Sequence, residues 1–322
     1  MGETPNLAAR LQAIAEPDQV VIGGSTRRLI GNLFELEDLG PRELKGLGSV
    51  SAWAVLRQGT VEGRFEALHG GGLTALVGRE EEFELLRRRW RQVQGGGGQV
   101  VLLSGEPGIG KSRLTAALIE RIASEPHTRL RYFCSPQHCD SAFHPIIGQL
   151  ERAAGFGHRD DAEAKLDKLD TLLSETATTA EDRALIAELL SLPNDGRHPA
   201  LTLGAQRRRQ RTLQALQWQL EALAHQQPVL MVFEDVHWID PTSLEVLSRT
   251  VERIQGIPVL LIVTFRPEFD PPWAGQSRVA SVTLNRLGER DATAIIERAP
   301  SSGCKPRQSL RSPRRAWLLA MA

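Results

Sequence analysis

The residue types and spacing at residues 105–112 are those of a phosphate-binding loop. The segment Gly-Glu-Pro-Gly-Ile-Gly-Lys-Ser matches the Walker A pattern G-x-x-x-x-G-K-[ST] in full. Its glycines let the backbone turn so that N–H groups face the phosphates. Lys111 is expected to reach the β and γ phosphates, and the hydroxyl of Ser112 is expected to coordinate Mg²⁺. The glycines of this segment are Gly105, Gly108 and Gly110.

The flanking sequence supplies the context that this loop needs. Residues 100–103 form an apolar strand before it, and residues 111–123 form a helix after it. The positive N-terminus of that helix faces the same anion, and Arg113 in its first turn is a further candidate contact. A chance glycine-rich turn is disfavoured because motif and context agree. The loop therefore predicts a site for a Mg–nucleoside triphosphate.

A second apolar strand ends in two acids, which is a Walker B arrangement. Residues 229–233 are Val-Leu-Met-Val-Phe, and Glu234 and Asp235 follow. One carboxylate holds Mg²⁺ or its water shell, and its neighbour orients or activates the attacking water. By position, Glu234 is the expected metal ligand and Asp235 the expected base; the reverse assignment stays open because aspartate is the commoner metal-side acid. The predicted Mg²⁺ ligands are Ser112, Glu234 and Asp235.

A third apolar strand carries polar residues at its end. Residues 259–263 continue into Thr264-Phe265-Arg266. Thr264 at the end of a central strand can sense the γ-phosphate, and Arg266 can place positive charge beside it. The alternative is that Arg266 pairs with a surface carboxylate. The sensor interpretation is favoured because ligands bind at the carboxyl edge of such a sheet.

These motifs need a parallel sheet to bring them together. Residues 100–103 and 130–134 are expected to form strands, and the continuous apolar runs at residues 229–233 and 259–265 are typical of parallel strands buried on both faces. Residues 140–226 are expected to be mostly helical. The sequence therefore predicts an α/β protein of the P-loop NTPase type, with a three-layer parallel sheet and helical insertions.

Composition restricts the partners. Lys plus Arg number 39 and Asp plus Glu number 39, so no global field favours nucleic acid or an anionic membrane. The apolar run at residues 257–265 is far shorter than the roughly 20 residues of a spanning helix. Three cysteines fit a reducing compartment. We expect a cytoplasmic protein with no membrane and no nucleic-acid partner.

Together these pieces resemble the STAND class of signalling ATPases. Residues 76–80, Leu-Val-Gly-Arg-Glu, are similar to the entry motif of that class, and residues 234–241 are similar to its Walker B extension. Residues 264–266 are similar to its sensor strand. The resemblance implies that Gly78 and Arg79 lie near the adenine and that the nucleotide is ATP.

The N-terminal segment, residues 1–56, resembles the C-terminal end of a class III adenylate/guanylate cyclase domain. In that family an N-x-x-x-R pair stabilises the cyclising transition state and a lysine contacts the phosphates. Asn6 and Arg10 match the pair, one helical turn apart, and Lys45 matches the lysine. The family's metal-binding aspartates have no counterpart, so we expect a truncated α/β cyclase-fold fragment with vestigial residues and no cyclase activity from this chain alone. The other interpretation is that Asn6 caps the helix and Arg10 is solvated.

The expected domain order follows from these resemblances. A linker spans residues 57–75, the ATPase domain spans residues 76–300, and residues 301–322 form an atypical tail that is disordered or translated out of frame. Both ends look cut from a longer bacterial cyclase–ATPase signalling protein with cyclic-nucleotide output. A protein partner or self-association is expected.

Weaker features favour simple structural roles. A zinc site is disfavoured because the spacing of its candidates is not standard; these are Cys134, His138, Cys139 and His144. His237 could contact phosphate or pack beside Trp238. The basic run at residues 207–211 is expected to be a solvated or acid-paired face.

Three functional hypotheses follow from the sequence. The first is a signal-transduction ATPase that binds ATP with Mg²⁺ and hydrolyses it slowly. The second is a non-catalytic interaction module in which the nucleotide is structural and residues 140–226 dock a partner. The third is a non-functional gene fragment. Phosphate release distinguishes the first from the second.

Replacing Lys111 with Ala tests the phosphate loop. The variant loses a charge-assisted contact of about 1.5–3 kcal/mol, so ATP affinity should fall by roughly 10- to 100-fold. Titration calorimetry of the wild-type and Lys111→Ala chains with Mg-ATP measures the change. Unchanged affinity would contradict the assignment of the loop.

Overall fold

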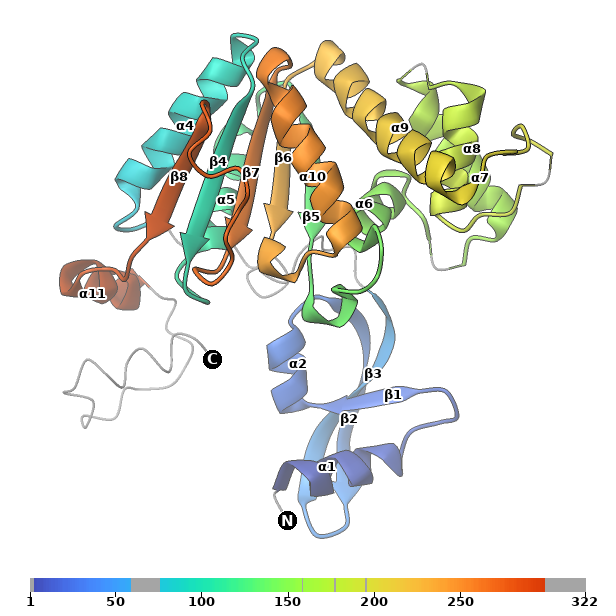
Figure 1. Ribbon diagram of the computed structural model, residues 1–322. Coiled ribbons are helices and arrows are strands. Elements are labelled where there is room, and N and C mark those ends of the chain that lie inside the picture. Colours follow the sequence, from blue (N-terminus) through green and yellow to red (C-terminus); the bar gives the residue numbers. More distant parts are fainter. Residues whose placement is uncertain (1–2, 59–75, 158, 177, 195, 299–322) are drawn as a thin grey trace. The chain divides into compact units, whose positions relative to one another are not determined.

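The computed structural model describes residues 3–58, 76–157, 159–176, 178–194 and 196–298 (Figure 1). The chain separates into two compact units, with the boundary between Ala75 and Leu76. Most of the predicted linker and the predicted tail lie outside the described residues.

The N-terminal unit is a small antiparallel sheet with helices. The strands are ordered β1-β3-β2, and Leu11, Leu44 and Ala52 form a buried cluster between α1 and the sheet. The N-cap of the second helix is Gly23, and no side chain caps this helix. The elements are α1 Glu3–Gln12, β1 Val20–Gly23, α2 Gly24–Ile30, β2 Phe34–Leu44 and β3 Gly48–Gln58.

The second unit is built on a parallel sheet. Every adjacent pair of its strands is parallel, and the spatial order is β5-β6-β7-β4-β8 (Figure 1). All strand carboxyl ends therefore meet at one edge, which confirms the predicted α/β sheet. The strands are β4 Gln99–Gly105, β5 Thr128–Phe133, β6 Val229–Glu234, β7 Val259–Phe265 and β8 Val279–Leu284.

The degree of burial of each strand explains which strands can be predicted from the sequence. β6 and β7 are buried at every residue, and their sequences are continuous apolar runs. β8 is an edge strand in which polar residues alternate with apolar ones, and only its last residue is buried. Its weak apolar signal explains why the sequence analysis did not identify this fifth strand.

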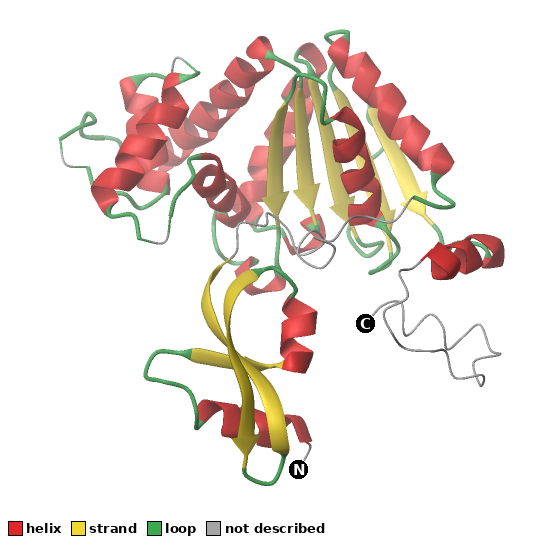
Figure 2. Ribbon diagram, turned by 180° about the vertical axis from the view of Figure 1, so that it is seen from behind, coloured by secondary structure: helices red, strands yellow, loops and turns green. Residues whose placement is uncertain are grey.

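Helices cover both faces of the sheet. Alternate strand residues pack on α4 Glu80–Gln94 and α5 Lys111–Ile122, and the others pack on α6 His144–Ala153 and α10 Pro241–Arg253. α10 lies in front of the strands in Figure 1, and Figure 2 shows the opposite face, also covered by helices. The period of two along each strand produces this division into three layers.

The insertion between β5 and β6 is helical, as predicted. It contains α6, α7 Ala162–Ser174, α8 Ala180–Leu189 and α9 Ala205–Gln226. Asp161 and Thr179 cap α7 and α8 by accepting hydrogen bonds from backbone N–H groups, so residues 162–189 form two separate helices. α11 Glu289–Arg298 follows β8.

Among the described residues, none of the helices combines the length and the apolar character that a membrane crossing requires.

Substituting Gly98 tests the packing at the start of β4. A Cβ atom there would lie 1.6 Å from the backbone oxygen of Ile254 and 2.9 Å from that of Ile257. Because backbone atoms cannot move aside without a large energetic cost, Gly98→Ala should lower the unfolding free energy by at least about 1–3 kcal/mol. Gly256→Ala is the control, since a Cβ atom added there would meet no described atom within 4 Å. Urea unfolding that ranks the two variants equally would contradict this packing.

Candidate functional site

The phosphate loop joins β4 to α5 at the carboxyl edge of the sheet. Gly108 has φ of +72° and Gly110, the N-cap of α5, has φ of +106°, a region that favours glycine. At Gly105 a Cβ atom would lie 2.8 Å from the side chain of Ile109 and 3.1 Å from the backbone oxygen of Leu284. The glycines are therefore required by the backbone path, and the N-terminus of α5 opens onto the loop.

Lys111 lies folded over this loop. Its side chain is 7% exposed, and its Nζ donates to the backbone oxygens of Gly105 at 2.7 Å and Glu106 at 3.0 Å. Burial lowers the pKa of Lys111, the nearby Asp235 opposes that shift, and Arg266 adds to it. The ammonium group thus stands at the loop among the other predicted charged residues.

Ser112 contacts the last residue of the Walker B strand. Its Oγ donates to Oε2 of Glu234 at 3.1 Å, although 122 positions separate the two residues. The other carboxylate oxygen, Oε1, accepts from Nη2 of Arg131 at 2.5 Å. The side chains of Glu234 and Arg131 are both buried, so this ion pair is desolvated. Glu234, rather than Asp235, is the acid in contact with Ser112.

The oxygens gathered here suit Mg²⁺. This ion prefers hard oxygen ligands and is commonly held by one or two carboxylates together with substrate phosphates. Among the described residues there is no group of three His, Cys, Asp or Glu that could hold a metal alone. Ser112 and Glu234 therefore fit a metal that arrives with a nucleotide.

Asp235 adopts an unusual backbone conformation. Its φ is +57°, in the left-handed region, and its side chain is exposed. Its N–H donates to Oγ1 of Thr264 at 3.0 Å, and Thr264 is only 1% exposed. The hydroxyl of Thr264 thus fixes the turn after β6, and strain of this kind gathers at functional sites.

Arg266 lies beside this turn. Its guanidinium is 5.7 Å from the ring centre of Trp238 and 3.9 Å from the carboxylate of Glu268. Burial lowers the pKa of both Lys111 and His237, and the positive charge of Arg266 adds to both shifts. Arg266 thus has a distant carboxylate partner in Glu268, and its role beside the γ-phosphate stays a prediction.

Gly78 and Arg79 connect the entry segment to the loop. The buried guanidinium of Arg79 donates to the backbone oxygens of Ile109 at 3.4 Å and Asn285 at 2.5 Å, and to Glu82 at 3.0 Å. Gly78 has φ of +66°, and a Cβ atom there would lie 2.7 Å from the carboxylate of Asp291. Arg79 thus fastens the entry segment to the phosphate loop; its proximity to adenine stays a prediction.

A model of the AAA ATPase domain matches residues 75–263, which include the phosphate loop, the acidic strand end and most of β7. The chain belongs to the AAA ATPase domain family. Its parallel sheet and phosphate loop have the P-loop NTPase fold.

One curated relative is an uncharacterized protein of Rhizobium meliloti (strain 1021), 31% identical over 297 residues. The alignment covers 90% of this chain. Residues 75–322 alone make up less than that share, so the alignment also includes residues of the N-terminal unit. The chain spans only 28% of the length of that relative.

Two solved structures are similar to part of this chain. Cdc6p from Pyrobaculum aerophilum is 14% identical with a TM-score of 0.39, covering 68% of this chain and 48% of its own. Drosophila ORC bound to DNA is 10% identical with a TM-score of 0.36, covering 65% of this chain and 43% of its own.

The predicted cyclase residues all belong to the N-terminal unit. Asn6 and Arg10 are exposed on α1, and Lys45 is exposed in the turn after β2. Leu11 and Leu44, their sequence neighbours, share the small buried cluster of this unit. Helix and turn therefore pack on one another, while a cyclase role for the three residues stays a prediction.

The weaker candidates of the sequence are accounted for without a metal. Cys134 is buried, and burial raises the pKa of its thiol, which opposes the thiolate that zinc needs. His138 and His144 stack with ring centres 3.6 Å apart. The described residues offer no metal-binding group that includes these side chains.

The basic run at the start of α9 is largely paired with acids, which confirms the acid-paired interpretation. Arg208 pairs with Glu188 at 2.5 Å, and Arg211 pairs with Glu181 at 3.1 Å. Arg209 pairs with Glu245.

Arg113, the other basic candidate of the sequence, lies in the first turn of α5, 3.9 Å from Glu120.

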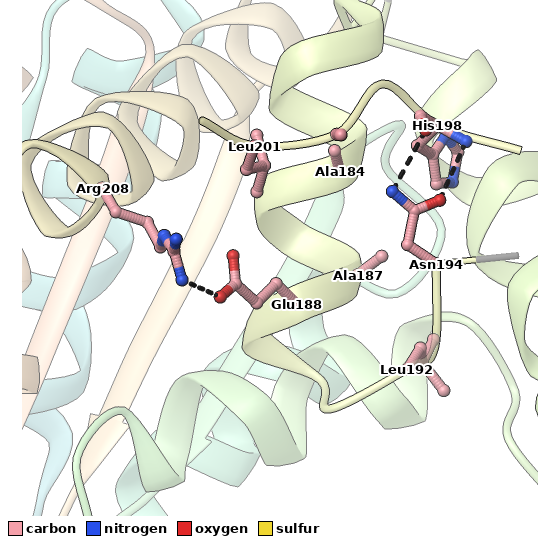
Figure 3. A pocket seen from close by; sticks show the side chains of 9 residues that line it. Ala184, Ala187, Glu188, Leu192, Asn194, His198, Leu201 and Arg208 are labelled. Atoms are coloured by element: carbon pink, nitrogen blue, oxygen red, sulfur yellow. Dashed lines mark hydrogen bonds and ion pairs between the residues drawn. The ribbon is translucent and has the colours of Figure 1, made fainter. Parts of the chain in front are cut away.

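Two cavities of about 340 Å³ lie in the helical insertion, one of them shown in Figure 3. The Glu188–Arg208 ion pair borders both, and Asn194 holds the backbone of His198 at the rim of the first. None of the predicted nucleotide-binding residues lines either cavity. The phosphate loop is therefore identified by its sequence motif and its backbone geometry, and not by a cavity.

Sequence analysis missed two buried charged residues. Arg131 interrupts an apolar strand and pairs with Glu234. Asp240 is 1% exposed, and its Oδ1 caps α10 and accepts from the N–H of Phe143 at 3.2 Å. An arginine within a buried strand is a signal that could have been noted, since such a charge requires a partner.

Replacing Arg79 with Met tests the clamp on the phosphate loop. Two backbone oxygens, of Ile109 and Asn285, would lose a donor at about 1–3 kcal/mol each, so stability should fall by roughly 2–6 kcal/mol. Arg91→Met is the control, because that side chain is 58% exposed and lies 3.4 Å from its partner Glu84. Equal melting temperatures for the two variants would argue against the clamp.

Proposed function

We propose that this chain is an ATP-binding, slowly hydrolysing ATPase module of a signalling protein of the STAND type. The observation that carries the proposal is the contact between Ser112 and Glu234 at 3.1 Å. It unites the Walker A and Walker B motifs at the sheet edge. Membership in the AAA ATPase domain family supports the nucleotide-binding part.

The residues fit the tasks of phosphoryl transfer. Backbone N–H groups of residues 108–112 and the ammonium of Lys111 would hold the β and γ phosphates. Ser112 and Glu234 would hold Mg²⁺, which when bound neutralises charge on the phosphate oxygens. Asp235 would orient the attacking water and accept its proton as the bond between the γ-phosphorus and the ADP oxygen breaks.

Slow turnover is expected from the exposure of the site. Asp235 is exposed, and the side chain of Arg266 is 35% exposed. Water is therefore poorly excluded, so electrostatic contacts to the transition state are weakened. An ATP-bound state with a long lifetime suits a molecular switch better than a metabolic enzyme.

The signalling part of the proposal rests on the order of the two units. The N-terminal unit carries Asn6, Arg10 and Lys45 at positions that resemble a class III cyclase, and the longer Rhizobium relative also aligns with part of this unit. We propose that ATP binding controls cyclic-nucleotide output in such a longer arrangement. A protein partner or a second copy, rather than nucleic acid, would receive the signal.

A non-catalytic interaction module is the second candidate. The two cavities between α8 and α9 favour it, because they could receive a partner without any hydrolysis. In that case nucleotide would bind and phosphate release would be absent.

Replacing Asp235 with Asn distinguishes the two candidates. Loss of the group that orients water should slow phosphate release by roughly 100-fold or more, while ATP affinity changes by less than about threefold. Single-turnover release of phosphate and calorimetric titration measure the two effects.

Glu252→Gln is the matched control, since Glu252 is an exposed acid on α10, outside the predicted site, and should leave release unchanged. An unchanged rate of phosphate release in the Asp235→Asn variant would contradict the proposed role of Asp235. A collapse of release in Glu234→Gln alone would then exchange the two acidic roles.

A further inference from the structure

His237 is a polar residue of the site that the proposed mechanism does not use. It lies in the short 3-10 turn η2 Val236–Trp238, two residues after Asp235. Both ring nitrogens are buried, and neither has a hydrogen-bond partner among the described residues. Burying a polar atom without a partner costs free energy, so an imidazole with two such atoms calls for an explanation.

The backbone, rather than the imidazole, fixes the position of this turn. The N–H of Trp238 donates to the backbone oxygen of Asp235 at 2.9 Å, and the N–H of Asp235 donates to Thr264 at 3.0 Å. The imidazole of His237 also packs on Trp238, with ring centres 5.0 Å apart and planes tilted by 46°. Its ring nitrogens are therefore not needed to hold the turn.

The surroundings of the imidazole belong to the phosphate end of the site. Burial lowers the pKa of the imidazole, Asp235 and Glu268 oppose that shift, and Arg266 and Lys111 add to it. His237 follows Asp235 by two residues and packs on Trp238, and the guanidinium of Arg266 lies over the ring of that same tryptophan. The imidazole therefore lies near Asp235 and Arg266, two residues that are expected at the last phosphate.

An oxygen of a γ-phosphate is the kind of partner these nitrogens lack. Phosphate oxygens are strong, charged acceptors, and an N–H···O⁻ hydrogen bond is about twice as strong as a neutral one. A nucleoside diphosphate has no group at that position. A contact made only with the triphosphate changes the ratio of the two affinities rather than both affinities together.

We propose that His237 contacts the γ-phosphate and makes this domain prefer a nucleoside triphosphate to a diphosphate. The inference rests on the proposed function, because it requires nucleotide at the phosphate loop. It assigns to the Walker B turn the discrimination on which a nucleotide switch depends, since a ligand shifts a two-state protein only by its differential affinity. The alternative is that His237 only packs against Trp238.

Two substitutions separate these roles. His237→Phe keeps an aromatic ring against Trp238 and removes both nitrogens. His237→Gln keeps a donor and an acceptor and loses the ring. Packing alone predicts that the Phe variant resembles the wild type, whereas a phosphate contact predicts that the Gln variant does.

The experiment is calorimetric titration of the full chain with Mg-ATP and with Mg-ADP, for the wild type and both variants. We expect the ATP-to-ADP affinity ratio to fall about tenfold in His237→Phe, with ADP affinity unchanged within about twofold. His237→Gln should keep the ratio within about threefold of the wild type. Melting curves verify that each variant is folded.

Each remaining outcome counts against the inference. An unchanged ratio in His237→Phe, or an equal loss of both affinities, would assign His237 to packing. If His237→Phe fails to fold, a wild-type ratio in His237→Leu, or a tenfold loss in His237→Gln, would also overturn the contact. Failure of the wild type to bind either nucleotide would instead refute the proposed function.

Discussion

The contact between Ser112 and Glu234 is the interaction on which the candidate site depends. It joins the helix after β4 to the end of β6, two segments that are distant in sequence. Arg131 holds the other oxygen of the same carboxylate from the neighbouring strand β5. A buried acid with two partners has little freedom, so the metal-side oxygen is held in place before any ligand binds.

The parallel sheet makes this contact possible. Because its strands run in one direction, the residues that follow β4, β6 and β7 arrive at the same edge. The apolar interior of the sheet contributes stability, and the edge bears the unusual features: positive φ at Gly108, Gly110 and Asp235, and a buried Lys111. Arg79 ties the entry segment to this edge from the outside.

Much of this arrangement could be predicted from the sequence. The Walker motifs carry their own spacing, and the apolar runs of β6 and β7 are unambiguous. β8 was missed because an edge strand needs less apolar sequence. Arg131 and Asp240 could not be assigned, since their roles depend on partners that only the folded chain brings near.

The most direct test of the central claim is titration of the purified chain with ATP and GTP in the presence and absence of Mg²⁺, with phosphate release followed in parallel. The account predicts Mg²⁺-dependent, ATP-selective binding and slow release that requires Lys111. A folded chain that binds neither nucleotide would contradict it, because the motifs would then be present without a working site.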